Sequence, residues 1–147
     1  MMMKLDGVDL FNFITEAGPF TDAMTKGLFR QLLTTVISCH QRGVLHRDIQ
    51  DANILLNLDT REIKPINFGS SAILLKCKLY CEREGTKAYF PPDWFLYGSY
   101  RAKGLTVWSL DILLFDVLSG NLPWDNATKR IGNETPWLEG LVLSREA

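Results

Sequence analysis

The chain has 147 residues, of which 46% are hydrophobic and 22% are charged, and its formal net charge is −1. These values are typical of one soluble globular domain, and they argue against nucleic acid or an anionic membrane surface as the main partner. The most apolar region, 105–118, is interrupted by Asp111 and Asp116 and is too short to span a bilayer.

Two helices are predicted in the first third of the chain. The segment Asp9–Ala17 carries its apolar residues on one helical face, and a Gly-Pro pair follows it. Thr21 is a suitable N-cap for the next helix, which we expect to run to about Gln41 and to end before Gly43.

Two short strands are predicted next, at Ile54–Leu58 and Glu62–Phe68, joined by a polar turn. Pro65 lies inside the second strand and has no N–H to donate, so that strand is expected to be an edge strand or to be locally disrupted. The following segment, Ser70–Tyr89, has no hydrophobic periodicity and several basic residues. We predict a mobile, basic surface segment there.

The last third is predicted to be helical. Pro92 can begin a short helix, because proline is tolerated in a first turn. The segment Ala102–Ser119 is apolar on nearly all sides, which is typical of a buried helix. Asp111 would then be an unpaired buried carboxylate, costing several kcal/mol or having a raised pKa. A final short helix is expected near residues 138–142.

One polar loop carries the clearest chemical signal. The sequence His46-Arg47-Asp48 is followed after four residues by Asn53, and short apolar runs bracket the loop. Phosphoryl transfer needs a carboxylate that accepts a hydroxyl proton and an amide oxygen that holds a metal ion, and Asp48 and Asn53 have this spacing.

These features resemble the C-terminal lobe of a protein kinase, specifically of the Pim family of Ser/Thr kinases. The segments that carry the resemblance are DLFNFITEAG, GVLHRDIQDANILLNL, INFGSSAILLK, GTKAYFPPDW and VWSLDILLFDVLSGNLPW. The resemblance implies a mainly α (α+β) fold with a small two-stranded β element and no N-terminal lobe. It divides the chain into an N-terminal extension (1–8), a partial kinase domain (9–125) and a divergent tail (126–147).

The resemblance also implies roles for individual residues, with ATP and magnesium as cofactors. Asp48 would be the catalytic base, and Arg47 would pair with a charged group in the activation segment. Asn53 would hold a metal ion, and Asn67 would stand where the principal metal ligand should be. The residues implied in nucleotide binding are Leu55 and Ile66 at the floor of the adenine pocket and Asp9 near the ribose, together with Asn67.

Two positions depart from the family pattern within the catalytic motifs. Gln50 occupies the position of a lysine that faces the transferring phosphate, and Asn67 replaces the aspartate of Asp-Phe-Gly. Magnesium favours carboxylate oxygen, and phosphoryl transfer depends on cations placed in advance. We therefore expect weak or absent binding of ATP and magnesium, and impaired catalysis.

Three functions remain open from the sequence. The first is a Pim-like Ser/Thr kinase fragment with little or no activity, the second a pseudokinase-type module that binds a protein, and the third a truncated, non-functional paralogue product. The site residues also have plainer explanations, because Asp48 and Asn53 can organise the loop by hydrogen bonds alone. Leu55 and Ile66 can likewise be ordinary core residues.

A protein or peptide partner of basic character is implied by the family. Asp9 and Asp51 remain acidic, but Asn12 and Ala52 occupy positions where relatives are acidic, so selection of basic peptides should be weaker. Three unevenly spaced cysteines favour reduced thiols, and no leader peptide is evident, so a cytoplasmic or also nuclear location is predicted. The oligomeric state is left open.

Overall fold

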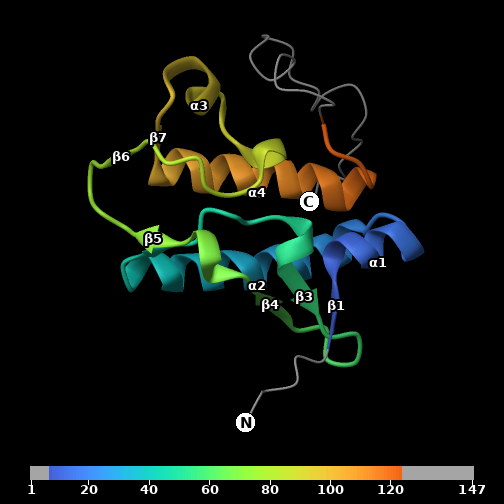
Figure 1. Ribbon diagram of the computed structural model, residues 1–147. Helices are drawn as coiled ribbons and strands as arrows, with labels where there is room; N and C mark the ends of the chain where they lie inside the picture. The colour runs from blue at the N-terminus through green and yellow to red at the C-terminus, as the bar shows by residue number, and fades with distance from the viewer. Residues whose placement is uncertain (1–6, 124–147) are drawn as a thin grey trace.

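The computed structural model describes residues 7–123 of the chain (Figure 1). Two long helices, α2 (Asp22–Gln41) and α4 (Ala102–Ser119), run alongside each other and share one hydrophobic core. Two shorter helices, α1 (Leu10–Ala17) and α3 (Pro92–Tyr97), flank them. The expected helices at 9–17, 22–41 and 102–119 are therefore found, with Asp9 preceding α1.

Side-chain caps explain where the first two helices begin. The carboxylate of Asp9 accepts a hydrogen bond from the backbone N–H of Asn12 at 2.9 Å, and the hydroxyl of Thr21 accepts one from the N–H of Met24 at 3.3 Å. Each cap satisfies an N–H group that has no partner inside its helix. Asp9 is therefore the N-cap of α1.

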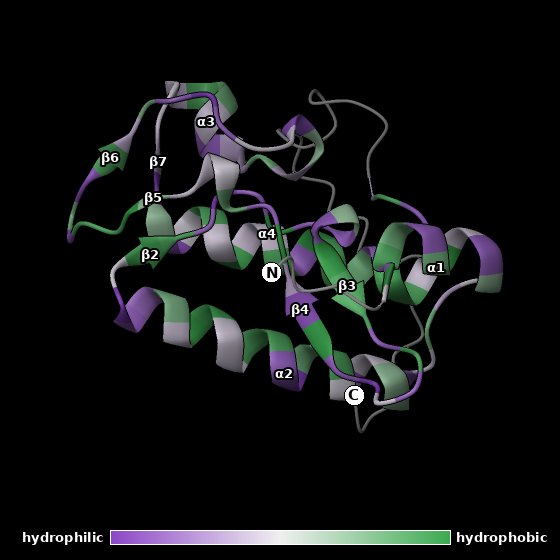
Figure 2. Cartoon of the chain, turned by 60° about the horizontal axis from the view of Figure 1, so that its bottom comes forward, coloured by the Kyte–Doolittle hydropathy of each residue, from purple (hydrophilic) through white to green (hydrophobic). Residues whose placement is uncertain are grey.

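The central sheet has three strands where two were predicted. Its order is β1-β3-β4, formed by β1 (Val8–Asp9), β3 (Ile54–Leu56) and β4 (Ile63–Pro65). Strand β3, which is hydrophobic and coloured green in Figure 2, lies between β1 and β4 (Figure 1), and Pro65 lies on the edge strand β4, where its missing N–H is tolerated. A strand of only two residues has no periodicity of its own, so β1 could not be recognised in the sequence.

Two further strand pairs correct the prediction of an irregular segment at 70–89. In the first, β2 (Val44–Leu45) pairs with β5 (Ala72–Ile73), and in the second, β6 (Leu79–Tyr80) pairs with β7 (Tyr100–Arg101). Both pairs are antiparallel, and each joins segments far apart in the chain. These pairs attach the segment after the Asn-Phe-Gly sequence to β2, which precedes the polar loop at 46–53, and to β7, which precedes α4.

Helix α4 was predicted to be a buried helix, but it is buried along one side only. A stripe of buried residues runs along one side, whereas Val107 is 48% exposed and Asp111 is also exposed. Partial burial still raises the pKa of the Asp111 carboxyl, but the side chain reaches solvent. The buried carboxylate of this helix is instead Asp116, which is 5% exposed. The stripe comprises Ala102, Leu105, Thr106, Ser109, Ile112, Leu113, Asp116 and Val117.

The C-terminal helix predicted from the sequence and a membrane-spanning helix are the last two features to compare with the structure. The short helix expected at 138–142 lies outside the described residues. Within residues 7–123, no helix combines the length and the apolar character that a bilayer crossing requires.

Candidate active site

The polar loop between β2 and β3 is anchored at both ends by buried apolar residues. Leu45 precedes it and Ile54 follows it, each only 1% exposed, and Ile49 in its middle is 6% exposed. A single 3₁₀ turn, Asp51–Asn53, leads the loop into β3. These anchors hold the intervening polar side chains in one arrangement, and we call residues 46–53 the catalytic loop.

Asp48 lies at the centre of this loop and is only 8% exposed. One carboxylate oxygen accepts hydrogen bonds from Gln50 Nε2 at 3.0 Å and from Thr86 Oγ1 at 2.8 Å. The other accepts one from Asn53 Nδ2 at 2.9 Å. The negative charge of Asp48 is thus stabilised by three neutral donors, and we call Asp48, Gln50, Asn53 and Thr86 the inner cluster.

Gln50 has a clear structural role in this cluster. Its side-chain nitrogen contacts both the Asp48 carboxylate and the Thr86 hydroxyl. A lysine here would supply a positive charge, but a carboxamide supplies only a dipole. The loop is therefore joined to the segment around Thr86 without any cation beside Asp48 in the inner cluster.

The two asparagines predicted as metal ligands are adjacent. Asn53 also donates from Nδ2 to the backbone oxygen of Asp48 at 2.8 Å, and its side-chain oxygen accepts a long hydrogen bond of 3.4 Å from Asn67 Nδ2. Asn67 is exposed and has a left-handed backbone with φ of 62°, which asparagine tolerates better than most residues. The structure therefore brings Asp48, Gln50, Asn53 and Asn67 together.

The other predicted nucleotide residues lie on the neighbouring sheet. Asp9 and Leu55 face each other across β1 and β3, and Leu55 is half-buried. Ile66 is also half-buried, and its N–H donates to the backbone oxygen of Asn53 at 2.9 Å. Both carboxylate oxygens of Asp9 accept hydrogen bonds from Asn12, at 2.9 and 2.7 Å. The role of Asp9, Leu55 and Ile66 in nucleotide binding stays a prediction.

His46 connects the loop to the segment that carries Asn67. Its Nδ1 accepts from the backbone N–H of Asp48 at 3.2 Å, so the proton of the neutral ring is on Nε2, which donates to the backbone oxygen of Ile66 at 2.9 Å. Burial lowers the pKa of His46, which keeps the ring neutral. These two hydrogen bonds of His46 hold the His-Arg-Asp motif at a fixed distance from the Asn-Phe-Gly motif that follows Ile66.

Arg47 connects the same loop to a more distant segment. Its guanidinium lies 3.5 Å from the Glu82 carboxylate, and its Nε donates to the backbone oxygen of Ser70. The expected charged partner of Arg47 is thus Glu82. Gly85 also packs so closely here that an added Cβ would lie 2.3 Å from the backbone oxygen of Arg47. Only glycine allows this approach.

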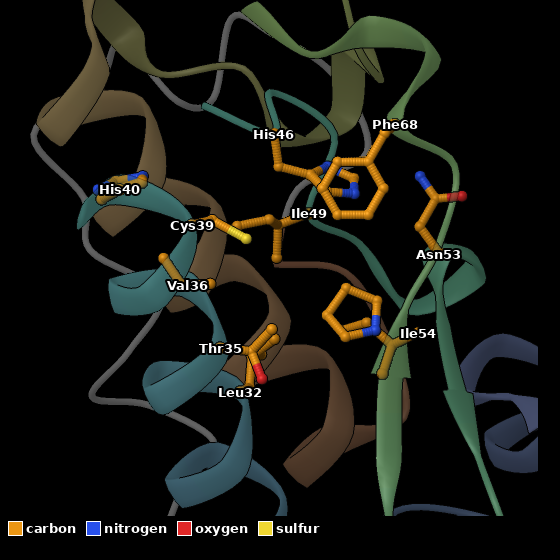
Figure 3. A pocket seen from close by; sticks show the side chains of 11 residues that line it. Leu32, Thr35, Val36, Cys39, His40, His46, Ile49, Asn53, Ile54 and Phe68 are labelled. Carbon is orange, nitrogen blue, oxygen red and sulfur yellow. The ribbon is translucent and has the colours of Figure 1, made fainter. Parts of the chain in front are cut away.

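An apolar pocket lies between the loop and α2 (Figure 3). It is lined by residues that include Cys39 of α2, Ile49 of the loop and Ile54 of β3, and Phe68 meets the His46 ring edge-on with centroids 4.5 Å apart. The cavity has a volume of about 10 Å³, which is room for one water molecule. The pocket therefore anchors the loop and is too small for a nucleotide.

Comparison with known proteins decides the family. A sequence model described as the protein kinase domain matches residues 1–139. The chain belongs to the protein kinase domain family. The match continues past residue 125, and the predicted division into an extension, a partial domain and a divergent tail stays a prediction.

Individual relatives are similar over most of this chain. The serine/threonine-protein kinase pim-2 of Danio rerio is 43% identical over 136 residues, covering 86% of this chain and 44% of that protein. The serine/threonine-protein kinase prk-2 of Caenorhabditis elegans is 42% identical over 119 residues, covering 81% and 27%. The first similarity confirms the predicted resemblance to Pim kinases. The chain spans less than half the length of these relatives.

The family implies ATP and magnesium, and the donor atoms here fit magnesium poorly. The site offers amide oxygens from Asn53 and Asn67, and both oxygens of Asp48 already accept hydrogen bonds. Within residues 7–123 there is no group of three or more His, Cys, Asp or Glu side chains suited to a metal ion. Magnesium is a hard cation that binds carboxylate oxygen best, so this donor set is unfavourable.

The sequence reasoning named Asp51 as a retained acidic residue but missed its proximity to Asp116 of α4. Asp51 and Asp116 both line an open cleft of about 900 Å³. Burial, followed by the nearby Asp51 carboxylate, raises the pKa of Asp116 to about 7. Burial and the same carboxylates also raise the pKa of Tyr89. The spacing of Asp116 from Ile112 and Leu113, which are buried on the same side of α4, was the available signal.

Proposed function

We propose that the chain is the C-terminal lobe of a Pim-like Ser/Thr protein kinase in which phosphoryl transfer is greatly impaired. The observation that supports this proposal is the inner cluster, where three neutral groups surround the Asp48 carboxylate. The kinase-family match supports the general class of reaction, and the neutral amides support its impairment.

The physical argument concerns charge rather than shape. Asp48 keeps a carboxylate that can accept a hydroxyl proton, so the position of a base is retained. Catalysis of phosphoryl transfer depends mainly on fixed positive charge near the transferring group. Gln50 and Asn67 supply neither a cation nor a carboxylate that would bind one. We propose that ATP and magnesium bind weakly as a result.

A reversion experiment tests this proposal. The chain and its double variant Gln50→Lys, Asn67→Asp are compared for magnesium-dependent binding of a fluorescent ATP analogue and for phosphate transfer to an arginine-rich peptide. The double variant should bind the nucleotide at least about tenfold more tightly in magnesium, because it restores one cation and one carboxylate. The natural chain should show little transfer.

The contrary result is equally clear. If the natural chain transferred phosphate at about 1–100 s⁻¹, the ordinary range for kinases, the proposed impairment would be wrong. Asp48→Ala should abolish that transfer if the loop is responsible. An absence of any gain in the double variant would show that the two amides do not limit nucleotide binding.

A second candidate function is a protein-binding module for a basic segment. The supporting observation is the open cleft lined by Asp51 and Asp116, where burial, followed by repulsion from the Asp51 carboxylate, raises the pKa of Asp116. A guanidinium or ammonium group would relieve this repulsion and form charge-assisted hydrogen bonds. Binding through this cleft does not require the inner cluster to be catalytic.

The two candidates can be separated by a binding measurement. An arginine-rich peptide is titrated with the chain by fluorescence anisotropy, using Asp51→Asn, Asp116→Asn and the exposed control Asp59→Asn. Each cleft variant should weaken binding by about fivefold or more, and more so at low salt, whereas the control should not. Equal affinity in all variants would exclude the cleft as the binding site.

A further inference from the structure

A second hollow lies away from the catalytic loop and has the opposite charge. Its volume is about 590 Å³, and it is formed by the end of α2, the residues that follow β5 and the start of α4. These three parts come together at the edge of the molecule near β5 and β7 (Figure 1). We call it the basic pocket, and its lining residues are His40, Leu74, Leu75, Lys76, Cys77, Lys78, Arg101, Ala102 and Lys103.

Four cationic side chains and no acidic side chain line the basic pocket. Arg101 donates to the backbone oxygen of Cys77 at 3.5 Å, and the ammonium of Lys78 lies 4.7 Å from the centre of the Tyr80 ring. These contacts hold two of the cations in place, and the Lys78 ammonium also interacts at longer range with the Glu82 carboxylate, whose pKa it helps to lower. Among residues 7–123, no carboxylate forms an ion pair with any of the four.

The start of α4 adds to the positive potential of the pocket. Ala102, its first residue, lines the pocket, and the helix has neither a side-chain N-cap nor an acidic residue in its first turn. Its first N–H groups and the helix dipole therefore favour an anion here. His40 Nε2 lies 3.4 Å from Thr106 Oγ1, and this hydrogen bond connects the end of α2 to the first part of α4.

We infer that the basic pocket binds a phosphorylated side chain on a protein segment. Four cations around one hollow match the charge of a phosphate group, which carries between one and two negative charges at neutral pH. Leu74, Leu75 and Ala102 supply apolar walls for the residues beside that phosphate. This function is separate from the acidic cleft, whose carboxyl groups would repel the same ligand.

The shape of the pocket selects this ligand over two related ones. A hollow with apolar walls accommodates a side chain and its neighbours, whereas an anionic membrane would press against a protruding basic surface. Free phosphate would use the cations but not the apolar walls. The pocket should therefore bind a phosphopeptide more tightly than either inorganic phosphate or a vesicle.

The test uses the full 147-residue chain and a fluorescein-labelled peptide with one phosphothreonine among alanine and leucine residues. The double variant Lys76→Ala, Lys103→Ala removes two exposed cations from the pocket. The control variant Lys26→Ala, Lys64→Ala removes two exposed lysines elsewhere on the molecule. Anisotropy should show binding weakened by about five- to tenfold in the pocket variant and unchanged in the control, with unaltered thermal melts in both.

Several outcomes would overturn the inference. Equal loss in the two variants would mean a general charge effect, and equal binding of the unphosphorylated peptide would mean that phosphate is not recognised. Displacement of the peptide by inorganic phosphate only at millimolar concentration is expected. Displacement at the peptide's own concentration would identify a site for free phosphate, and stronger binding to vesicles containing phosphatidylserine would identify a membrane surface.

Discussion

The catalytic loop carries two groups of polar side chains that differ in how their charge is compensated. In the inner cluster, hydrogen bonds from Gln50, Asn53 and Thr86 engage both oxygens of Asp48. In the acidic cleft, one oxygen of Asp51 accepts a hydrogen bond from the backbone N–H of Ala52, but the buried Oδ2 of Asp116 has no hydrogen-bond partner among the described residues. Burial, followed by the nearby Asp51 carboxylate, raises the pKa of Asp116 to about 7. The first group is satisfied by its own hydrogen bonds, and the second holds two carboxyl groups that cannot both ionise without cost.

This difference distinguishes the group of side chains that a bound ligand would stabilise from the group that needs none. Buried polar groups that hydrogen-bond one another stabilise the fold without a partner. Buried like charges destabilise it until a proton or a cation compensates them. The inner cluster therefore behaves as a structural support, while the acidic cleft is the part of the loop that a cationic partner would stabilise. Substitutions in the inner cluster and in the acidic cleft should therefore change the stability of the chain in different ways.

The largest effect is expected where the inner cluster meets the segment that carries Thr86. Gly85 has φ of 98°, and a Cβ there would meet the backbone oxygen of Arg47 at 2.3 Å. Gly85→Ala should therefore lower the free energy of unfolding by about 3–4 kcal/mol, combining backbone strain with a clash between backbones. Urea-induced unfolding followed by circular dichroism measures this change.

Gly98 provides the matched control for that substitution. Its φ is 66°, but an added Cβ would meet nothing within 4 Å. Gly98→Ala should therefore cost only about 1 kcal/mol, from backbone strain alone. Equal costs for the two variants would show that the contact between Gly85 and Arg47 does not hold the inner cluster in place.

The next effect concerns the acidic cleft and depends on pH. The pKa of Asp116 is raised from 3.8 to about 7 in the folded chain, so the folded state binds this proton more tightly than the unfolded state. The resulting stability is fully present below pH 3.8 and is lost as the pH rises through 7. Asp116→Asn should remove this dependence and stabilise the chain by about 2–3 kcal/mol at pH 8, allowing for solvent screening.

The measurement is the difference in unfolding free energy between the natural chain and Asp116→Asn at pH 5 and pH 8. Taking the difference cancels the titration of groups that do not interact with Asp116, such as the histidines, so that the difference reports on Asp116 and its neighbour Asp51. Asp111→Asn is the control on the same helix, because Asp111 is exposed and should change stability by less than about 0.5 kcal/mol at pH 8. A difference that does not change with pH would show that Asp116 is compensated in the folded chain.

The parts of the fold that the sequence predicts are those with local signals. Helix α1 follows from its apolar spacing and the Gly-Pro pair after it, α2 from apolar spacing and the cap Thr21, and α4 from its long apolar run. The two-residue strands β1, β5, β6 and β7 have no periodicity, because only pairing with a distant segment makes them strands. Prediction from one sequence therefore recovers the helices and misses these connections.

The candidate site shows the same division. Spacing identified Asp48 and Asn53, and the resemblance to kinases identified Gln50 and Asn67; the structure brings all four together within one hydrogen-bonded group. Thr86, which donates to Asp48 from 38 residues away, was not predicted, because nothing local distinguishes that threonine from any other. Spacing along the chain identifies residues of one loop but not the partners supplied by tertiary contacts.

The smallest effect tests whether Thr86 supports the inner cluster. Thr86→Val keeps the shape of the side chain but removes the donor that lies 2.8 Å from the Asp48 carboxylate. Hydrogen bonds to charged groups contribute more than neutral ones, and Gln50 remains as a second donor to the same oxygen, so the expected loss is about 1–2 kcal/mol. Thr34→Val is the control, because its hydroxyl bonds only the backbone of its own exposed helix turn. If both variants lost the same small amount, Asp48 would not depend on Thr86, and the inner cluster would be held by residues of the loop alone.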